Sequence, residues 1–366
     1  MIPFLSFDYQ NKLLRSTFLE KTADFLDAKN YVLGQEVKAF EKNFAQLTKS
    51  KFSIGVASGL DALVIALKAL DINQGDEIIV PSNTYIATWL AISQMGAKIV
   101  PVEPDPRTYN LDPSKIQEKI TPRTKAIMPV HLYGQACNMT EIMQIARQHD
   151  LHVVEDNAQA HLAKWEGQVT GTFGLVNATS FYPTKNLGAL GEAGCITTDA
   201  EEIMTFCRAY RNYGSQKKYM NKYKGINSRI DEIQAAFLNA KLPLLEKFTS
   251  ERKILAAYYD AHLPKSEGLI LPYQAPESES VYHLYVIQTP KRDTLQKYLK
   301  KKGIGSSIHY PIPPHLQEAY KELGFKKGTF PIAEKLSKTL LSIPLYPGLK
   351  RSDQDYIIET ITHFQN

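Results

Sequence analysis

The segment 178–198, ATSFYPTKNLGALGEAGCITT, holds a lysine in a setting suited to covalent chemistry with a carbonyl compound. Its first residues favour a strand, which leads through Pro183 to Lys185. Three glycines follow the lysine, namely Gly188, Gly191 and Gly194. An amine held at a strand end by proline and glycines can lose solvation and form a Schiff base. Glycines also let the backbone pass close to a flat ring. The alternative is a surface lysine in a flexible loop, which the apolar approach and the glycines disfavour.

A carboxylate is expected at the end of another buried strand, in the segment VVEDNAQAH at 153–161. The apolar run places Asp156 at the carboxyl end of that strand, where a buried carboxylate needs a cationic partner or several hydrogen-bond donors. One such partner is a protonated pyridine nitrogen, whose ring the carboxylate would keep electron-poor. A structural carboxylate that caps the next turn is an equal alternative. A metal site built from Glu155, Asp156 and His161 is disfavoured, because their spacing matches no common ligand set.

A possible anion site lies in the segment GVASGLDAL at 55–63, where a strand ends and a helix begins at Ser58 and Gly59. The N–H groups at a helix N-terminus, with a serine hydroxyl beside them, can bind an anion without a lysine. Taken alone, the pattern is better explained by a serine that only caps the helix.

The stretch 208–229 is basic and aromatic and has no acidic residue. Four tyrosines are interleaved with its seven cations, which are Arg208, Arg211, Lys217, Lys218, Lys222, Lys224 and Arg229. Cations with aromatic rings suit a diphosphate that is linked to a base. Single-stranded nucleic acid is a competing partner for the same pattern, and a solvated basic loop is the simplest alternative.

The elements that must position these groups alternate between strands and helices over about residues 50–200. The predicted strands are Ser53–Ala57, Glu77–Val80, Lys98–Val102, Ala126–Val130, His152–Glu155, Ala178–Tyr182 and Cys195–Thr198. The predicted helices between and after them include Leu60–Leu70, Thr140–His149 and Arg229–Leu245. This alternation predicts a largely parallel sheet covered on both faces, with ligands bound beyond the carboxyl ends of the strands.

After residue 245 the pattern changes, so we expect a large domain at 1–245 and a smaller α+β domain at 246–366. Its predicted elements are helices at Glu251–His262, Arg292–Lys302, Ala333–Leu341 and Asp353–His363 and a strand at Tyr282–Gln288. Without a signal sequence, an apolar run of membrane-spanning length or a cysteine pair, the chain is expected to be a soluble cytoplasmic protein. Its net charge of +5 is too mild for a protein that coats nucleic acid.

Together these segments resemble the DegT/StrS-type sugar-nucleotide aminotransferases, a branch of the fold-type-I enzymes that use pyridoxal 5'-phosphate (PLP). The matching segments are GVASGLDALVIAL, GDEIIVPSNTYIATWLAI, PVHLYGQACNM, VVEDNAQAH, SFYPTKNLGALGEAGCITT and GINSRIDEIQAA. They occur in family order over about residues 50–240, with weaker likeness to the end. The resemblance implies an α/β fold like that of aspartate aminotransferase, with a mostly parallel sheet in the large domain.

The resemblance also implies roles around the cofactor ring. Lys185 would hold PLP as a Schiff base and then shuttle the proton, and Asp156 would pair with the pyridine nitrogen. Gln159 would lie near the ring's phenolic oxygen, and Tyr85 would stack on the ring face. No metal is implied.

At the cofactor phosphate, the resemblance implies Ser58, Gly59 and Ser180 from one subunit and Asn227 from the other. The implied assembly is therefore a homodimer with shared active sites. The family often has glycine where Leu162 follows AQAH, so an extra side chain there is expected to alter the rim of the site.

On the substrate side, the loop NLGALGEAG looks like that of members which aminate carbon 3 of a dTDP-linked keto-6-deoxyhexose, with L-glutamate as amino donor. The implied substrate contacts are Tyr182, Lys217, Arg229, His309 and Tyr310. His309 could instead be a structural histidine before a proline bend, and Arg229 could simply support a helix start. The implied pathway is deoxysugar biosynthesis for lipopolysaccharide or an S-layer glycan.

Three alternatives stay open for the activity. Amination at carbon 4 and PLP-dependent sugar dehydration are the rivals within the family. Relatives that dehydrate replace the lysine with histidine, so Lys185 favours transamination. The rival of another class is a non-catalytic PLP-binding regulatory protein.

Overall fold

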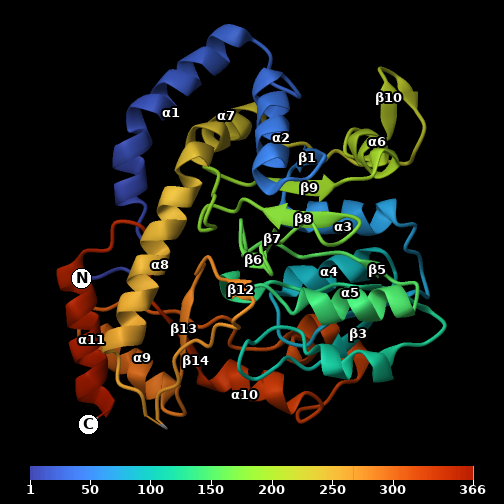
Figure 1. Cartoon of the computed structure of the whole chain (residues 1–366). Coiled ribbons are helices and arrows are strands. Elements are labelled where there is room, and N and C mark those ends of the chain that lie inside the picture. The colour runs from blue at the N-terminus through green and yellow to red at the C-terminus, as the bar shows by residue number, and fades with distance from the viewer. Residues whose placement is uncertain (267, 366) are drawn as a thin grey trace.

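A seven-stranded mixed sheet forms the centre of the large domain in the computed structural model, which describes residues 1–266 and 268–365 (Figure 1). From one edge to the other the strands are β3 (Lys98–Val102), β2 (Glu77–Pro81), β4 (Thr124–Ile127), β5 (His152–Val153), β8 (Asn177–Ser180), β9 (Gly194–Thr198) and β1 (Phe52–Val56). The pairs from β3 to β5 are parallel, and β9 runs antiparallel to both β8 and β1. Parallel bridges through Asp156 join the two parts of the sheet.

Both faces of this sheet are covered, as its apolar strands predict. In β2, Ile78 and Val80 pack into one core cluster and Ile79 packs into another, because successive side chains point to opposite faces. The helices that cover the two faces are α2 (Gln35–Thr48), α3 (Gly59–Ala69), α4 (Ile86–Gln94), α5 (Met139–Gln148), α6 (Glu201–Tyr210) and α7 (Glu232–Lys241).

The second core lies in the C-terminal part of the chain and includes Ile2 from the N-terminus. Its strands β13 (Tyr285–Gln288) and β14 (Leu340–Ile343) are antiparallel. Its helices are α8 (Leu245–His262), α9 (Arg292–Lys301) and α11 (Arg351–Gln365). The helix α10 (Pro331–Thr339) packs through Leu336 in another cluster, which includes Val130 and Leu132 of the large domain. Both chain termini lie at this end of the molecule, beside α11 (Figure 1). The boundary at residue 245 stays a prediction.

Smaller elements complete the fold. A long N-terminal helix, α1 (Asp8–Ala28), runs from the second core toward α7 and contacts it (Figure 1). The short strands are β6 (Lys164–Trp165), β7 (Gln168–Val169), β10 (Ser215–Lys217), β11 (Met220–Asn221) and β12 (Ser278–Glu279). In the described ranges no helix is long and apolar enough to cross a membrane.

Several predicted boundaries are wrong. The helix predicted to begin at Arg229 begins at Glu232, because the backbone is still extended at Asp231. That helix ends at Lys241, and a 3-10 turn at 242–244 that contains Pro243 leads directly into α8. The predicted strand at 282–288 begins only at Tyr285, after a left-handed residue at Tyr282 (φ 44°).

Candidate active site

Lys185 lies in a tight loop beyond the end of β8, the lysine loop (residues 181–193). Its backbone N–H donates to the carbonyl of Tyr182 at 2.8 Å. A Cβ at Gly188 would lie 2.1 Å from the carbonyl oxygen of Pro183, so the loop can close only with glycine there. Burial lowers the pKa of the Lys185 amine to about 8, and the nearby Asp156 carboxylate opposes this shift. A lysine amine with a pKa lowered in this way can act as a nucleophile and carry a proton near neutral pH.

The Asp156 carboxylate lies opposite this lysine and is held by donors from α4 and its own turn. Thr88 donates to Oδ2 at 2.8 Å, and the Ala158 N–H donates to Oδ1 at 3.2 Å. The Thr84 hydroxyl lies 2.9 Å from that of Thr88 and extends the chain of hydrogen bonds. Burial raises the pKa of Asp156, so a cationic partner is needed to keep the carboxylate charged. Sequence reasoning missed Thr88, which lies far from Asp156 along the chain.

The neighbouring carboxylate, Glu155, has a structural role. It is fully buried, and its oxygens accept N–H bonds from Gly171 at 2.7 Å, Phe173 at 2.6 Å and Gly174 at 2.9 Å. Nε2 of His131 lies 2.8 Å from its second oxygen. Because its oxygens accept these hydrogen bonds from residues 171–174, Glu155 faces the protein interior rather than a ligand.

His161, the third residue of the disfavoured metal set, holds the lysine loop. Its Nδ1 accepts the N–H of Leu187 at 3.1 Å, so Nε2 carries the proton and donates to the carbonyl of Ser180 at 2.9 Å. Burial lowers the pKa of His161 to about 3, which keeps the ring neutral. Across the described ranges, no cluster of histidine, cysteine and acidic residues could hold a metal ion.

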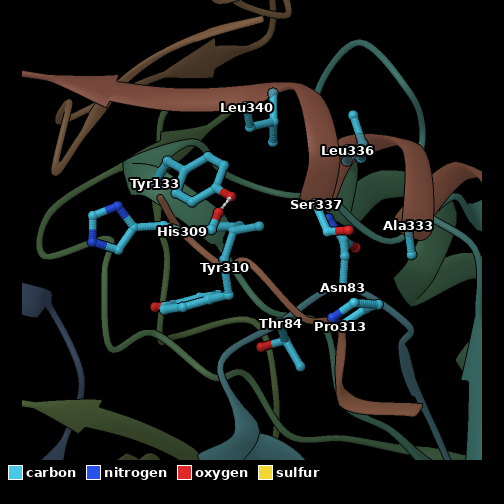
Figure 2. A pocket seen from close by; sticks show the side chains of 11 residues that line it. Asn83, Thr84, Tyr133, His309, Tyr310, Pro313, Ala333, Leu336, Ser337 and Leu340 are labelled. Carbon is cyan, nitrogen blue, oxygen red and sulfur yellow. Dashed lines mark hydrogen bonds between the residues drawn. The ribbon is translucent and has the colours of Figure 1, made fainter. Parts of the chain in front are cut away.

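Four aromatic and polar side chains from distant segments surround the space near Asp156 and Lys185. Gln159 donates to the Tyr310 hydroxyl at 3.0 Å and accepts the N–H of Tyr133 at 2.7 Å. The rings of Tyr85 and Tyr310 lie 5.3 Å apart. Figure 2 shows the hydroxyl of Tyr133 directed at the carbonyl of His309, which it hydrogen-bonds. The segment 309–310 is thus tied directly to the large domain.

The His309 imidazole is neutral in this environment. Its Nδ1 lies 2.8 Å from the Ser342 hydroxyl. Burial and, to a smaller extent, the positive charge of Lys185 lower the pKa of His309 to about 4. A neutral imidazole beside the lysine can donate or accept a hydrogen bond without adding a second positive charge.

An anion site is formed where α3 begins. Ser58 caps the helix by accepting the Asp61 N–H at 3.1 Å, as the capping alternative predicted. A Cβ at Gly59 would lie 2.5 Å from the Ser180 Cβ, so these two residues meet closely and leave no room for a larger side chain. Helix N–H groups and two hydroxyls from Ser58 and Ser180 are suitable partners for a phosphate.

Ser228, which sequence reasoning also missed, links this anion site to the segment that carries Asn227. The Ser228 hydroxyl donates to Asp61 Oδ2 at 2.6 Å and accepts the Ala57 N–H at 3.2 Å. Asn227 itself is exposed. Its predicted role in a second subunit is not tested by a single chain and stays a prediction.

The other predicted substrate residues lie on the surface or in the basic stretch. Lys217 is exposed on β10, which projects from the molecule beside α6 (Figure 1), and Tyr182 is also exposed. Arg229 donates to Asn212 Oδ1 at 2.8 Å, and its guanidinium lies 5.4 Å from the ring centre of Tyr213. The lysine and arginine have no direct contact with Lys185 among the described residues.

The sequence predicts that the Leu162 side chain alters the rim of the site, but the structure places this side chain against a core cluster. Leu162 adopts a left-handed backbone (φ 64°), a conformation that favours glycine. Its side chain packs against the core cluster that contains Phe181 and Leu187. The Leu162 side chain therefore packs against the lysine loop and supports it from the core side.

These residues fit PLP as a set. The close approach of Gly59 and Ser180 forms a phosphate-sized cradle, and the buried Asp156 carboxylate needs a cation such as a protonated ring nitrogen. The Lys185 amine lies close enough for its charge to act on that carboxylate. Phosphate, ring nitrogen and aldehyde each have a matching partner in this chain.

Known proteins that are similar in sequence and fold show the family of this chain. A model of the DegT/DnrJ/EryC1/StrS aminotransferase family matches residues 12–362. A dTDP-3-amino-3,6-dideoxy-alpha-D-galactopyranose transaminase of Aneurinibacillus thermoaerophilus is 47% identical over 364 residues, covering 100% of this chain and 99% of the relative. The X-ray structure of S. venezuelae DesV in complex with a ketimine intermediate has a TM-score of 0.97 and 42% identity, covering 99% of this chain and 98% of that chain.

A crystal structure of NtdA from Bacillus subtilis with bound cofactor PMP has a TM-score of 0.91 and 31% identity, covering 99% of this chain and 84% of that chain. The fold-type-I architecture predicted from the sequence is confirmed by these superpositions. The family model and the relative both extend over almost the whole chain. The chain therefore belongs to the DegT/DnrJ/EryC1/StrS aminotransferase family.

Proposed function

We propose that this chain is a PLP-dependent aminotransferase that moves the amino group of L-glutamate to carbon 3 of a dTDP-linked 3-keto-6-deoxyhexose. The products would be 2-oxoglutarate and a dTDP-3-amino-3,6-dideoxyhexose. The observation that carries the proposal is that a buried carboxylate, Asp156, and an amine of lowered pKa, Lys185, lie close enough to influence each other's charge. The full-length relative named for a dTDP-3-amino sugar supports the choice of carbon 3 and of the nucleotide.

The chemistry supplied by PLP, when bound, is an electron-withdrawing ring that stabilises negative charge on a neighbouring carbon. Asp156 would hold the ring nitrogen of PLP through its carboxylate, and a positive charge there would offset the burial that raises the pKa of Asp156. Lys185 would hold the cofactor and, when its amine is free, would take up and return a proton. Its lowered pKa of about 8 suits this work, because the amine can be both deprotonated and reprotonated near neutral pH.

The sugar is proposed to lie against His309, Tyr310 and Tyr182. Tyr310 is already oriented by its hydrogen bond from Gln159, and His309 by Ser342. Lys217 and Arg229 are proposed to contact the diphosphate of the substrate that is bound in the site of the partner subunit. The exposure of Lys217 on β10 supports this, because β10 projects away from the body of the chain (Figure 1).

The assembly is proposed to be a homodimer in which Asn227 completes the phosphate site of the partner subunit. The exposure of Asn227 and the anchoring of its neighbour Ser228 support this arrangement. A cytoplasmic location and a role in deoxysugar supply for a surface glycan are proposed with it.

Product analysis tests the activity. Purified protein, PLP and L-glutamate are incubated with dTDP- and UDP-linked sugars that carry a keto group at carbon 3 or carbon 4, in galacto and gluco forms, and the products are identified by NMR. We expect amination at carbon 3 of the dTDP-linked sugars, and none by the Lys185→Ala variant. Amination at carbon 4, dehydration, or PLP binding without any turnover would contradict the proposal and would support one of the three alternatives.

A further inference from the structure

The side chain next to the reactive lysine is fastened to a distant segment of the chain. Asn186 is buried, and its Nδ2 donates to the carbonyl of Val281 at 3.0 Å. Its Oδ1 lies 3.2 Å from Nδ1 of His283, which is also buried. The Asn186 side-chain amide therefore connects the loop that carries Lys185 to residues 281–283 through both its nitrogen and its oxygen.

The segment 281–283 is itself rigidly held by the large domain and by α8. The Val281 N–H donates to the carbonyl of Gly134 at 2.9 Å. Gly134 has φ 100°, and a Cβ there would lie 2.7 Å from the His283 nitrogen, so only glycine permits this approach. On the other side, the buried Arg252 donates to the carbonyls of Tyr282 and His283, both at 3.2 Å.

These contacts fix which nitrogen of His283 carries the proton. A backbone carbonyl only accepts hydrogen bonds, so the amide NH₂ of Asn186 must face Val281 and its oxygen must face His283. An amide oxygen only accepts as well, so Nδ1 of His283 is the donor. In the neutral ring, Nε2 is then unprotonated.

The charges around His283 keep the ring neutral. Burial lowers the pKa of His283 well below its usual value, and the positive charges of Lys185 and Arg252 lower it further. The imidazole therefore adds no positive charge beside the lysine at neutral pH, and its Nδ1–H stays available to Asn186.

We propose that Asn186 and His283 are a positioning pair that holds Lys185 at its working place beside the cofactor. The pair does so by fixing the residue that follows the lysine to the segment 281–283. The inference rests on Lys185 being the PLP-binding lysine proposed above. Without the pair, the loop would relax and the amine would gain water. A better solvated amine would hold its proton more tightly, so its pKa would rise toward the ordinary lysine value.

The test measures the titration of Lys185 in the protein without cofactor. Competitive acylation at a series of pH values, with the Lys185 peptide quantified by mass spectrometry, gives the midpoint. His283→Phe keeps a ring but removes the donor. His283→Asn restores a donor near the Nδ1 position. Asn186→Ala removes the acceptor from the other side and serves if His283→Phe fails to fold. His315→Phe is the matched control, because His315 is an equally buried histidine paired with Glu334 rather than with the lysine loop.

We expect the midpoint to rise by about half a pH unit or more in His283→Phe and Asn186→Ala, and to stay near the wild-type value in His283→Asn and His315→Phe. A midpoint unchanged in both of the first two variants would overturn the positioning role, and so would an equal shift in His315→Phe. Borohydride reduction of the PLP-loaded wild-type protein separates the two proposals. An adduct at another lysine contradicts the proposed function, whereas an adduct at Lys185 with unmoved midpoints contradicts only the positioning pair.

Discussion

Two lysines of this chain have a similarly lowered pKa, and their surroundings distinguish the proposed reactive lysine, Lys185, from Lys241. Burial lowers the pKa of both Lys185 and Lys241 to about 8. The Lys241 amine donates a 2.6 Å hydrogen bond to the Gly188 carbonyl, so it supports the lysine loop from outside the site. Lys185 lies near Asp156 instead. A perturbed pKa therefore identifies the reacting group only together with its partner.

Replacing Lys185 with methionine should stabilise the protein without cofactor. The folded-state pKa of about 8 lies below the ordinary value of 10.5, so at pH 7 folding confines a charge that the unfolded chain solvates freely. We expect Lys185→Met to raise the free energy of unfolding at pH 7 by about 1–2 kcal/mol, a figure reduced for partial solvent exposure. The gain should shrink as pH rises from 8 to 10.5, because the wild-type protein gains stability across this window. Urea unfolding of both proteins between pH 7 and 10.5 measures the difference in the free energy of unfolding. A difference that grows with pH would contradict the lowered pKa of Lys185.

Asp156→Asn should impair the chemical step far more than binding. The amide cannot balance the positive charge at the ring nitrogen, so we expect kcat to fall by about 10²–10³-fold, the usual loss for one preorganised electrostatic partner. KM for the sugar should change little, because Asp156 acts on the cofactor. Steady-state kinetics at saturating PLP check this, and a rise in KM at constant kcat would place Asp156 at the sugar instead.

At the scale of elements, the strands that carry the site could be predicted, since buried parallel strands are short apolar runs bounded by polar residues. The N-terminal helix α1 could not. In α1 only Gln10, Leu14 and Phe18 are buried, which leaves too narrow an apolar stripe to indicate a helix from the sequence. Thr88 and Ser228 could not be predicted either, because each acts on a residue far away in the chain: Thr88 on Asp156 and Ser228 on Asp61.

The junction of α3 with the sheet should be intolerant of any side chain at Gly59. A Cβ there would lie 2.5 Å from the Ser180 Cβ and would push the phosphate cradle apart. We expect Gly59→Ala to weaken PLP binding by about tenfold or more, equivalent to about one lost charge-assisted hydrogen bond. Absorbance titration with PLP measures the affinity.

Gly75→Ala is the control for this substitution. Gly75 has φ 94° with open space around it, so alanine there costs stability through backbone strain and leaves the cradle unchanged. Equal losses of PLP affinity in the two variants would show that the effect is general destabilisation.

At the scale of the whole molecule, a complementation experiment tests the proposed homodimer with shared active sites. A Lys185→Ala dimer lacks the reactive amine, and an Asn227→Ala dimer lacks the phosphate contact that the partner subunit would receive. When the two proteins are dissociated, mixed and allowed to reassociate, half of the dimers should be hybrids. Each hybrid has one site in which both Lys185 and the partner's Asn227 are wild type. At limiting PLP we therefore expect about a quarter of the wild-type activity from a mixture of two impaired proteins. Activity no higher than the average of the two parents would show that Asn227 serves its own subunit.

The central claim is that the cofactor is joined to one amine, and borohydride reduction tests it most directly. The PLP-loaded protein is reduced, digested and mapped by mass spectrometry. We expect the added mass on the peptide that contains Lys185. An adduct on Lys241, whose pKa is lowered to the same value, or on any other lysine, would contradict the account.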